Sequence, residues 1–273
     1  MNTRCWINGE PGAQVAVDDR GLQYGDGLFE TLAVRQGRVA LLEYHLQRLA
    51  RGCARLLLQA LPLDLIREEI IAAAQDQQRA VLKLIVTRGV GERGYRPSRT
   101  AQPTRILMRY DWPDHPHTWQ QYGIRTRICK TALGSNPQLA GLKHLNRLEQ
   151  ILARAEWSDT DDIQEGLMLD ADGSVIEGTM TNVFARLAGG EWITPDLSCC
   201  GVTGVMRRYL LEQMQQAGIA VQVGKLAVAG LQTARELFVC NSIIGVWPAR
   251  QVDDWHYEVG EMTREAQQWV EQA

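Results

Sequence analysis

Apolar residues recur along the first 110 residues with two different periods. Runs of alternating apolar and polar residues predict β-strands, and apolar positions spaced three or four residues apart predict amphipathic helices. Gly and Pro residues mark the turns between these runs. The predicted elements of this region are strands at residues 5–8, 14–17, 28–34, 39–42, 81–87 and 104–110, and helices at 46–57 and 63–75.

The rest of the chain continues the same mixture after a loop rich in proline and histidine at residues 111–118. The predicted elements are strands at residues 123–129, 166–170, 174–177, 182–186, 220–223, 236–240 and 243–247, and helices from Lys143, after Gly204 and from Met262. We therefore predict an α+β protein with a small N-terminal domain over residues 1–110, an interdomain loop at 111–118 and a larger C-terminal domain over 119–273.

The composition suits an enzyme and argues against a polyanionic partner. The 273 residues are 45% hydrophobic and 22% charged, with a formal net charge of −3 and a pI of about 6.0. A slightly acidic chain has no electrostatic attraction for nucleic acid or an anionic membrane. No apolar run approaches the roughly 18 residues that a membrane span needs, and the N-terminus has no apolar signal core. We expect a cytoplasmic protein without nucleic-acid or membrane partners.

Neither the cysteines nor the histidines predict a metal site. The six cysteines are scattered without a C-x-x-C pair, so reduced and mostly buried thiols are expected. His115 and His117 flank a proline in the 111–118 loop, but no Cys or Glu lies nearby to complete a set of ligands. We expect no metal.

Lysine is rare in this chain, and Lys143 lies where chemistry is expected. The 29 basic residues include only four lysines, which leaves 25 arginines. Lys143 follows a short turn at Gly141 and precedes apolar residues at helical spacing, which predicts that it stands at the start of a helix: Leu145, Leu148, Ile151, Leu152 and Ala155.

A lysine at a helix start has a chemical consequence. The partial positive charge at the N-terminus of a helix disfavours a nearby cation by roughly 0.3–1 kcal/mol, which favours the neutral, nucleophilic form of the amine. Such an amine forms a Schiff base with a carbonyl substrate or with pyridoxal phosphate, which a permanently protonated arginine cannot do. The alternative is a solvated surface lysine.

Two glycine-rich segments resemble phosphate-binding patterns. Gly89-Val-Gly-Glu-Arg-Gly94 has the spacing of a dinucleotide fingerprint, but Pro97 prevents the helix that must follow, so we predict an arginine-rich flexible loop. Gly201-Val-Thr-Gly204 does lead into a helix, where backbone N–H groups and the Thr203 hydroxyl can hold a phosphate. The alternative for Thr203 is a simple helix N-cap.

Glu177 completes the set of groups that pyridoxal phosphate requires. This cofactor needs a lysine for its aldehyde, a phosphate cradle with a cation, and a carboxylate that keeps its pyridine nitrogen protonated. Glu177 ends an apolar strand and is followed by the small polar residues Gly178, Thr179, Thr181 and Asn182. As an isolated residue it is also compatible with a solvated strand end.

Together these motifs resemble the fold type IV pyridoxal-phosphate enzymes. The resemblance rests on Lys143, on Glu177-Gly-x-x-x-Asn-Val-Phe184, on Tyr24-Gly-Asp-Gly-Leu-Phe-Glu30 and on His45-Leu-Gln-Arg-Leu49. It runs from about residue 7 to 247, and the motifs occur in the order of that family. The segments around Lys143 and residues 87–95 resemble most closely its 4-amino-4-deoxychorismate lyase branch.

The resemblance implies a role for each matching residue. Lys143 would hold pyridoxal 5'-phosphate and act in catalysis together with the Thr31 hydroxyl, while Glu177 would pair with the pyridine nitrogen. Arg93 and Phe29 would face the substrate, with Arg93 meeting a substrate carboxylate. The remaining cofactor-binding residues implied are Arg48 at the phosphate, Asn182 near the ring oxygen, and Val202, Thr203, Asn241 and Ser242 around the phosphate cup.

The resemblance also implies a fold, an assembly and a reaction. The fold is a small N-terminal α/β domain and a larger β-barrel-like C-terminal domain, with the cofactor in the cleft between them, in a homodimer. The reaction is conversion of 4-amino-4-deoxychorismate to 4-aminobenzoate and pyruvate, a step of folate biosynthesis.

Two alternatives stay open. One is a D-amino-acid or branched-chain aminotransferase, which uses the same cofactor-binding residues on the same fold. Aminotransferases of this fold often carry a tyrosine where this chain has Phe29, so the missing phenol favours the lyase. The other is a non-catalytic carrier of pyridoxal phosphate.

Overall fold

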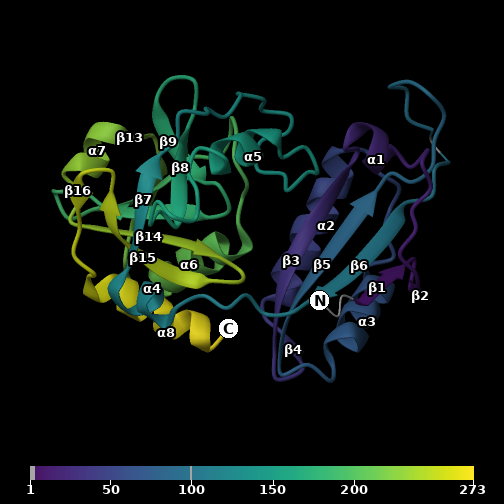
Figure 1. The fold of residues 1–273 in the computed structure, drawn as a ribbon, viewed down its shortest axis with the longest axis horizontal. Helices are drawn as coiled ribbons and strands as arrows, with labels where there is room; N and C mark the ends of the chain where they lie inside the picture. Colours follow the sequence, from purple (N-terminus) through teal and green to yellow (C-terminus); the bar gives the residue numbers. More distant parts are fainter. Residues whose placement is uncertain (1–3, 99) are drawn as a thin grey trace. The chain divides into compact units, whose positions relative to one another are not determined.

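The computed structural model describes residues 4–98 and 100–273, which form two compact units (Figure 1). The first unit comprises Met1–Pro113 together with Leu142–Asn146, and the second comprises Asp114–Gly141 and Arg147–Ala273. The short segment that carries Lys143 therefore belongs to the first unit, although both of its flanks belong to the second. No helix among the described residues is long and apolar enough to cross a membrane.

The first unit is a six-stranded sheet in the order β2-β1-β6-β5-β3-β4, with three helices. Its elements are β1 (Arg4–Ile7), β2 (Glu10–Pro11), α1 (Arg20–Tyr24), β3 (Gly27–Arg35), β4 (Arg38–Val39), α2 (Leu42–Arg55), α3 (Leu63–Ala74), β5 (Arg79–Thr87) and β6 (Thr104–Tyr110). Antiparallel pairing of β3 with β5 runs from Gly27↔Thr87 to Arg35↔Arg79 and forms the centre of the sheet.

Alternation along β3 decides what each face of this sheet carries. Leu28, Glu30 and Leu32 are buried, and Glu30 contacts residues of α2. Successive side chains of a strand point to opposite faces, so Phe29 and Thr31 lie on the other face. The same strand thus supplies apolar core on one side and candidate site residues on the other.

The second unit is built on a mixed sheet of ten strands in the order β12-β11-β10-β14-β15-β7-β8-β9-β13, with β16 paired to β15. Its strands are β7 (Ile124–Ile128), β8 (Glu165–Leu169), β9 (Ser174–Gly178), β10 (Asn182–Arg186), β11 (Trp192–Pro195), β12 (Val221–Gly224), β13 (Leu226–Ala227), β14 (Glu236–Asn241), β15 (Gly245–Val252) and β16 (Trp255–His256). Its helices are α4 (His117–Tyr122), α5 (Leu148–Arg154), α6 (Val205–Gln216), α7 (Val228–Gln232) and α8 (Glu261–Glu271).

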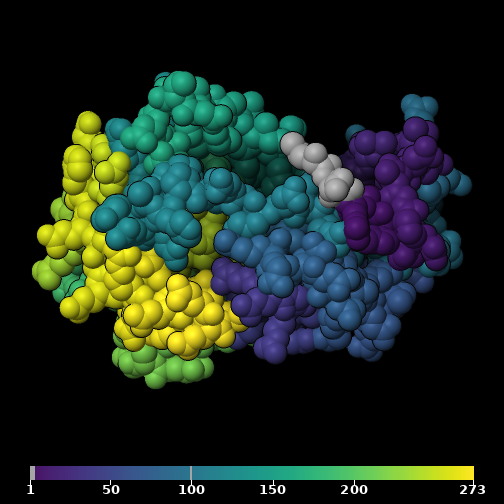
Figure 2. Space-filling model, turned by 60° about the horizontal axis from the view of Figure 1, so that its bottom comes forward, coloured from purple at the N-terminus to yellow at the C-terminus, as the bar shows by residue number. Residues whose placement is uncertain are grey.

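Buried aliphatic and aromatic residues from most of these strands form one core. It includes Val175, Val183, Leu237, Val239 and Trp247, each at most 4% exposed. Phe184 of β10 stacks on Phe238 of β14 with ring centroids 4.9 Å apart. The C-terminal helix α8 lies at the surface of this unit and accounts for much of the yellow in Figure 2.

Most predicted strands are present within one or two residues, but two predictions are wrong. Residues 14–17 are not a strand, and Val17 is 81% exposed, because this segment finds no partner in the sheet. The strand predicted at 39–42 ends at Val39, and Leu41 adopts a positive φ of 52° just before α2 begins. Several short elements were not predicted: α1, α4, α7, β2, β11, β13 and β16.

Candidate active site

Lys143 lies in an extended segment and not at the start of a helix, so that prediction is wrong. The Lys143 carbonyl accepts a hydrogen bond from the Phe29 N–H at 2.9 Å, and the Leu145 N–H donates to the Gly27 carbonyl at 3.1 Å. Residues 142–146 are therefore bound along β3 by strand-like hydrogen bonds. The Lys143 Nζ lies 4.3 Å from the centroid of the Phe29 ring.

The apolar pattern after Lys143 was misleading for a physical reason. Helix α5 begins at Leu148, and its apolar residues face outward: Leu148, Ile151 and Leu152 are 72%, 60% and 60% exposed. The helix dipole acts within the first turn, so it has no bearing on a lysine five residues before α5. The segment that carries Lys143 is instead hydrogen-bonded to β3 of the first unit.

Below β3, a buried cluster joins Glu30 to two residues of α2. His45 and Glu30 share a hydrogen bond of 2.6 Å between Nδ1 and Oε2. Arg48 donates from Nε to Glu30 Oε1 at 2.8 Å and from Nη2 to Glu30 Oε2. All three residues are at most 8% exposed. Arg48 is therefore a buried cation whose orientation is fixed by two hydrogen bonds to one carboxylate.

The charges in this cluster are set by opposing effects. Burial alone raises the pKa of Glu30, but the charge and hydrogen bonds of Arg48 and the hydrogen bond of His45 outweigh it and lower the pKa to about 2. Burial lowers the pKa of His45 in spite of Glu30. Its Nε2 is buried without a hydrogen-bond partner among the described residues. Glu30 is therefore a carboxylate at neutral pH.

The residues predicted to meet the substrate are placed differently from one another. Phe29 and Thr31 share the face of β3 opposite Glu30, and Phe29 contacts Lys143. Arg93 is exposed, and it lies in a loop rather than at a helix start, as predicted for residues 89–94. The base of that loop is tied down, because Arg20 donates to the Gly94 carbonyl at 2.8 Å and Gly94 N–H donates to the Tyr24 hydroxyl at 3.0 Å.

In the second unit, Glu177 and Asn182 meet at Val202. Glu177 is 4% exposed, and its Oε2 accepts a hydrogen bond from the Val202 N–H at 2.8 Å. Asn182 is 6% exposed and donates from Nδ2 to the Val202 carbonyl at 2.9 Å. Glu177 is not a solvated strand end. The structure brings three of the predicted residues together, two on strands β9 and β10 and one on the loop before α6.

The Gly201–Gly204 turn leads into α6, as predicted. The Thr203 N–H donates to the Gly141 carbonyl at 3.1 Å, and the Gly141 N–H donates to the Gly201 carbonyl at 2.8 Å. Gly204, not Thr203, is the N-cap residue, and no side chain caps this helix. A Cβ on Gly204 would lie 1.9 Å from Asn182 Oδ1, so any side chain at this position would displace Asn182.

Asn241 and Ser242 form a turn of their own. Asn241 Oδ1 accepts hydrogen bonds from the N–H groups of Ile243 and Ile244 at 2.8 and 2.9 Å, and its Nδ2 donates to the Met180 carbonyl at 3.2 Å. Asn241 therefore shapes the turn between β14 and β15 and connects it to the residues that follow Glu177.

Sequence reasoning missed three buried charged residues that support these elements. Glu30 was visible as part of a motif but received no role. Arg207 of α6 is 6% exposed and donates to the Thr194 hydroxyl at 3.0 Å and to the Pro195 carbonyl at 2.9 Å. Glu165 of β8 is fully buried. Long charged residues buried in helices and strands carry no local sequence signal, because their partners lie far along the chain.

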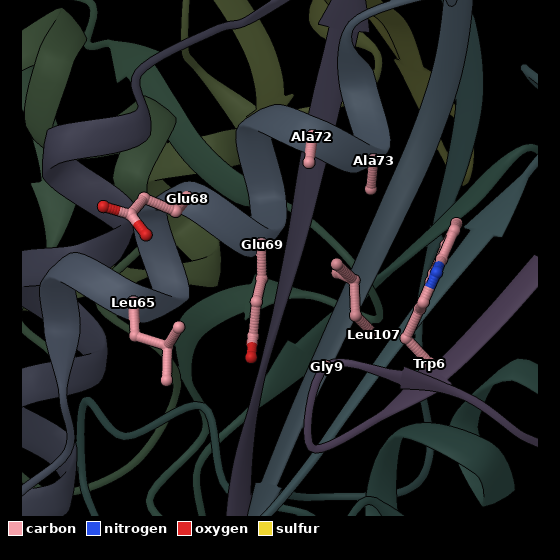
Figure 3. A pocket seen from close by; sticks show the side chains of 8 residues that line it. All are labelled: Trp6, Gly9, Leu65, Glu68, Glu69, Ala72, Ala73 and Leu107. Atoms are coloured by element: carbon pink, nitrogen blue, oxygen red, sulfur yellow. The ribbon is translucent and has the colours of Figure 1, made fainter.

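A pocket of about 320 Å³ in the first unit contains none of the predicted site residues. Figure 3 shows it between α3 and the strands β1 and β6, with Glu69 and Trp6 among its lining residues. Glu69 is paired with Arg105 at 2.7 Å. The candidate site is consequently defined by its hydrogen-bonded residues and not by this pocket.

Known proteins resemble this chain over nearly its whole length. The crystal structure of 4-amino-4-deoxychorismate lyase from Pseudomonas aeruginosa is 48% identical, with a TM-score of 0.94 over 98% of each chain. Aminodeoxychorismate lyase of Vibrio harveyi is 35% identical over 96% of this chain and 97% of its own length. A putative branched-chain-amino-acid aminotransferase of Methanocaldococcus jannaschii is 30% identical over 96% of this chain and 93% of its own length.

The fold is shared more widely than the sequence. The Escherichia coli branched-chain amino acid aminotransferase has a TM-score of 0.87 at 23% identity. The α+β fold of type IV and the resemblance predicted from the motifs are both confirmed. Since the family described as amino-transferase class IV matches residues 27–252, this chain belongs to the class IV aminotransferase family.

Proposed function

We propose that this protein is a pyridoxal-phosphate-dependent lyase that converts 4-amino-4-deoxychorismate to 4-aminobenzoate and pyruvate, a step of folate biosynthesis. The observation that carries the proposal is the 48% identity and 0.94 TM-score to the Pseudomonas aeruginosa lyase over 98% of both chains. Relatives that share only the fold say nothing about substrate.

The residues of both units fit pyridoxal phosphate. The first unit offers the Lys143 amine, the buried Arg48 guanidinium and a buried His45 Nε2 without a partner among the described residues. The second offers the buried Glu177 carboxylate and a glycine turn at the uncapped start of the 12-residue helix α6. Amine, cation, carboxylate and helix start are the groups that this cofactor needs.

Each residue then has a defined task. Lys143 would hold the cofactor through its aldehyde, Glu177 would keep the pyridine nitrogen protonated and Arg48 would bind the phosphate. Glu30 keeps Arg48 in one orientation through two hydrogen bonds. The others assigned to the cofactor are Asn182 near the ring oxygen and Val202, Thr203, Asn241 and Ser242 around the phosphate.

Proton transfer is assigned to the first unit. When bound, the cofactor ring accepts the electron pair that is released at the substrate. Once the substrate's amine has taken its place on the cofactor, the freed Lys143 Nζ would take the proton from C4 of the substrate ring. The bond between the ring and the enolpyruvyl oxygen would break, and Lys143 or the Thr31 hydroxyl would return a proton to the departing enol to give pyruvate. Arg93 meets a substrate carboxylate, and Phe29 forms an apolar wall beside the lysine.

We also propose a homodimer. Helix α5 presents Leu148, Ile151 and Leu152 to solvent, each at least 60% exposed, and such a row of large apolar side chains is typical of an interface. Light scattering of the wild type and of Ile151→Glu checks this, and a monomeric wild type contradicts it.

The decisive experiment offers the purified protein 4-amino-4-deoxychorismate without any 2-oxo acid. We expect continuous release of pyruvate and 4-aminobenzoate, because a lyase never has to give the substrate's amino group to the cofactor. A second candidate, an aminotransferase, is favoured by the 30%-identical putative aminotransferase. Fast amino-group transfer from a D- or L-amino acid to 2-oxoglutarate, with no pyruvate from aminodeoxychorismate, would establish that candidate instead.

A further inference from the structure

Glu165 is a fully buried carboxylate that binds the turn between β9 and β10. Its Oε1 accepts hydrogen bonds from the Thr179 N–H at 3.0 Å and the Thr179 hydroxyl at 2.5 Å. Its Oε2 accepts from the Met180 N–H at 3.3 Å and the Thr181 hydroxyl at 2.8 Å. A further bond comes from the neighbouring Gly166 N–H at 2.9 Å. Glu165 thus contacts every residue from 179 to 181.

The topology of the sheet explains why this turn needs an anchor. β9 and β10 are consecutive in the sequence, yet β14, β15, β7 and β8 lie between them in the order of the sheet. No ladder of hydrogen bonds therefore joins the two strands across the turn, as it does in an ordinary hairpin. One backbone bond closes the turn, from the Gly178 N–H to the Thr181 carbonyl at 2.7 Å.

The space around the anchor is filled. A Cβ on Gly178 would lie 2.1 Å from Thr181 Oγ1 and 2.8 Å from Glu165 Oε2, so a larger residue would displace the carboxylate or the hydroxyl. Because the packing is this tight, the turn can adopt only one conformation. The absence of a side chain at Gly178 and the hydrogen bonds to Glu165 together fix the conformation of the turn.

The groups that donate hydrogen bonds to Glu165 are neutral N–H and hydroxyl groups, so within the described part of the chain this carboxylate is not part of a buried ion pair. Burial raises its pKa against the opposing effect of its hydrogen bonds from Thr179, Gly166, Thr181 and Met180. A buried carboxylate that kept fewer donors would be strongly destabilising. A buried carboxylate at Glu165 is therefore tolerated only while the hydrogen-bond donors of the turn stay in place.

Both ends of the turn carry residues assigned to the cofactor. Glu177 precedes Gly178, and Asn182 follows Thr181. Both contact Val202, Glu177 at its N–H and Asn182 at its carbonyl, at 2.8 and 2.9 Å. A displaced turn would move these two side chains away from the loop that leads into α6.

We propose that Glu165 is a positioning residue that fixes Glu177 and Asn182 in the geometry required to bind pyridoxal phosphate. This role rests on the proposed function, because it assumes that both residues bind the cofactor. Glu165 itself touches neither cofactor nor substrate.

The test compares Glu165→Gln with the matched variant Glu236→Gln. Glu236 is also a buried carboxylate of the second unit, and it accepts hydrogen bonds from the Thr263 N–H at 2.7 Å and hydroxyl at 2.5 Å, next to the start of α8. In Glu165→Gln an amide NH₂ replaces one of two accepting oxygens and faces existing donors, whereas in Glu236→Gln the amide oxygen can keep both hydrogen bonds from Thr263. Apoprotein of each variant and of the wild type is titrated with pyridoxal phosphate, with the visible absorbance band and the rise in Tm as readouts.

We expect Glu165→Gln to raise the Kd for pyridoxal phosphate roughly tenfold or more, by analogy with the supporting partners of metal ligands. We expect it also to shift the visible band and to lose much of the Tm rise that the cofactor produces. Glu236→Gln should lower the Tm of the apoprotein but keep the Kd within about twofold of the wild type, because it anchors a helix remote from the turn. Equal Kd values and band positions for the two variants overturn the role of Glu165.

A second pair covers the case in which Glu165→Gln does not fold. Thr181→Val removes one hydroxyl donor to Glu165, and Thr181→Ser keeps it. A higher Kd in the valine variant that the serine variant restores supports the role, and identical Kd values overturn it. If the wild type itself shows neither a visible band nor a borohydride-fixed adduct, the proposed function fails as well. If the wild type binds pyridoxal phosphate and the variants have the same Kd, only the proposed role of Glu165 is contradicted.

Discussion

Two buried glutamates, one in each unit, show two ways to keep a carboxylate out of water. Glu30 in the first unit is surrounded by Arg48 and His45, and its pKa falls to about 2. Glu165 in the second unit is surrounded by N–H and hydroxyl groups, and burial raises its pKa. The same side chain at the same depth orients a cation in one unit and a turn in the other. The first unit concentrates positive charge, whereas the second supplies carboxylates and neutral donors.

The largest expected effect concerns Lys143, a cation of the first unit. Lys143→Ala should lower product formation by on the order of 10⁴-fold or more and abolish the borohydride-fixed adduct, because no other amine can replace the nucleophile. Lys83→Ala is the matched control, since Lys83 Nζ lies 5.4 Å from the same Phe29 ring that Lys143 contacts at 4.3 Å. An adduct that survives Lys143→Ala and maps to Lys83 would reverse the assignment.

The next effect tests the carboxylate side. Glu177→Gln should keep the fold and the covalent adduct but lower kcat by roughly 10²-fold, because a neutral amide stabilises a protonated pyridine nitrogen poorly. The change keeps the size of the side chain and one oxygen for the Val202 N–H. Turnover equal to that of the wild type would show that Glu177 serves only to hold Val202.

Removing the charge that orients Arg48 should have a smaller effect on catalysis and a clear effect on stability. Glu30→Gln leaves a buried guanidinium without its counter-ion, which typically costs about 3–5 kcal/mol of unfolding free energy. Denaturant unfolding measures this cost, and titration with pyridoxal phosphate should show weaker binding. A variant as stable as the wild type contradicts the view that the Arg48–Glu30 pair is coupled in the folded protein.

The smallest effect is a difference in the sign of pH dependence. Glu30 has a folded pKa of about 2 against an ordinary value of 4.5, so it stabilises the fold above 4.5, and this contribution is lost as pH falls toward 2. Glu165 has a raised folded pKa, so its contribution is most favourable at low pH and declines as pH rises past 4.5.

Unfolding free energies of the wild type, Glu30→Gln and Glu165→Gln between pH 3 and 7 measure this difference. The advantage of the wild type over Glu30→Gln should shrink on acidification, whereas its advantage over Glu165→Gln should grow. Slopes of the same sign for both variants would remove the distinction between the two glutamates.

Sequence patterns predicted the strands well where pairing is local or central. The strand at 104–110 is observed as Thr104–Tyr110, because its alternating residues pair with β5 along their whole length. The helix at Lys143 was wrong because residues 142–146 bind to β3, which lies more than a hundred residues earlier. Long-range backbone pairing overrode a local helical period.

Only part of the candidate site carries a local signal in the sequence. Glu177, Asn182 and Val202 follow from local motifs, and the structure brings them together. Glu165 could not be found, because its partners become neighbours only when the sheet brings β8 beneath the turn after β9. A buried glutamate at the start of a strand looks in the sequence like an exposed strand end.

The division of the chain into two interleaved units has a consequence for experiments that express it as fragments. The backbone passes between the units three times, after Pro113, after Gly141 and after Asn146. A gene fragment that stops at Pro113 encodes every strand of the first sheet and yet lacks Lys143. Two separately expressed halves would therefore bring Lys143 to the first sheet only if residues 142–146 of the longer half bind to the shorter half.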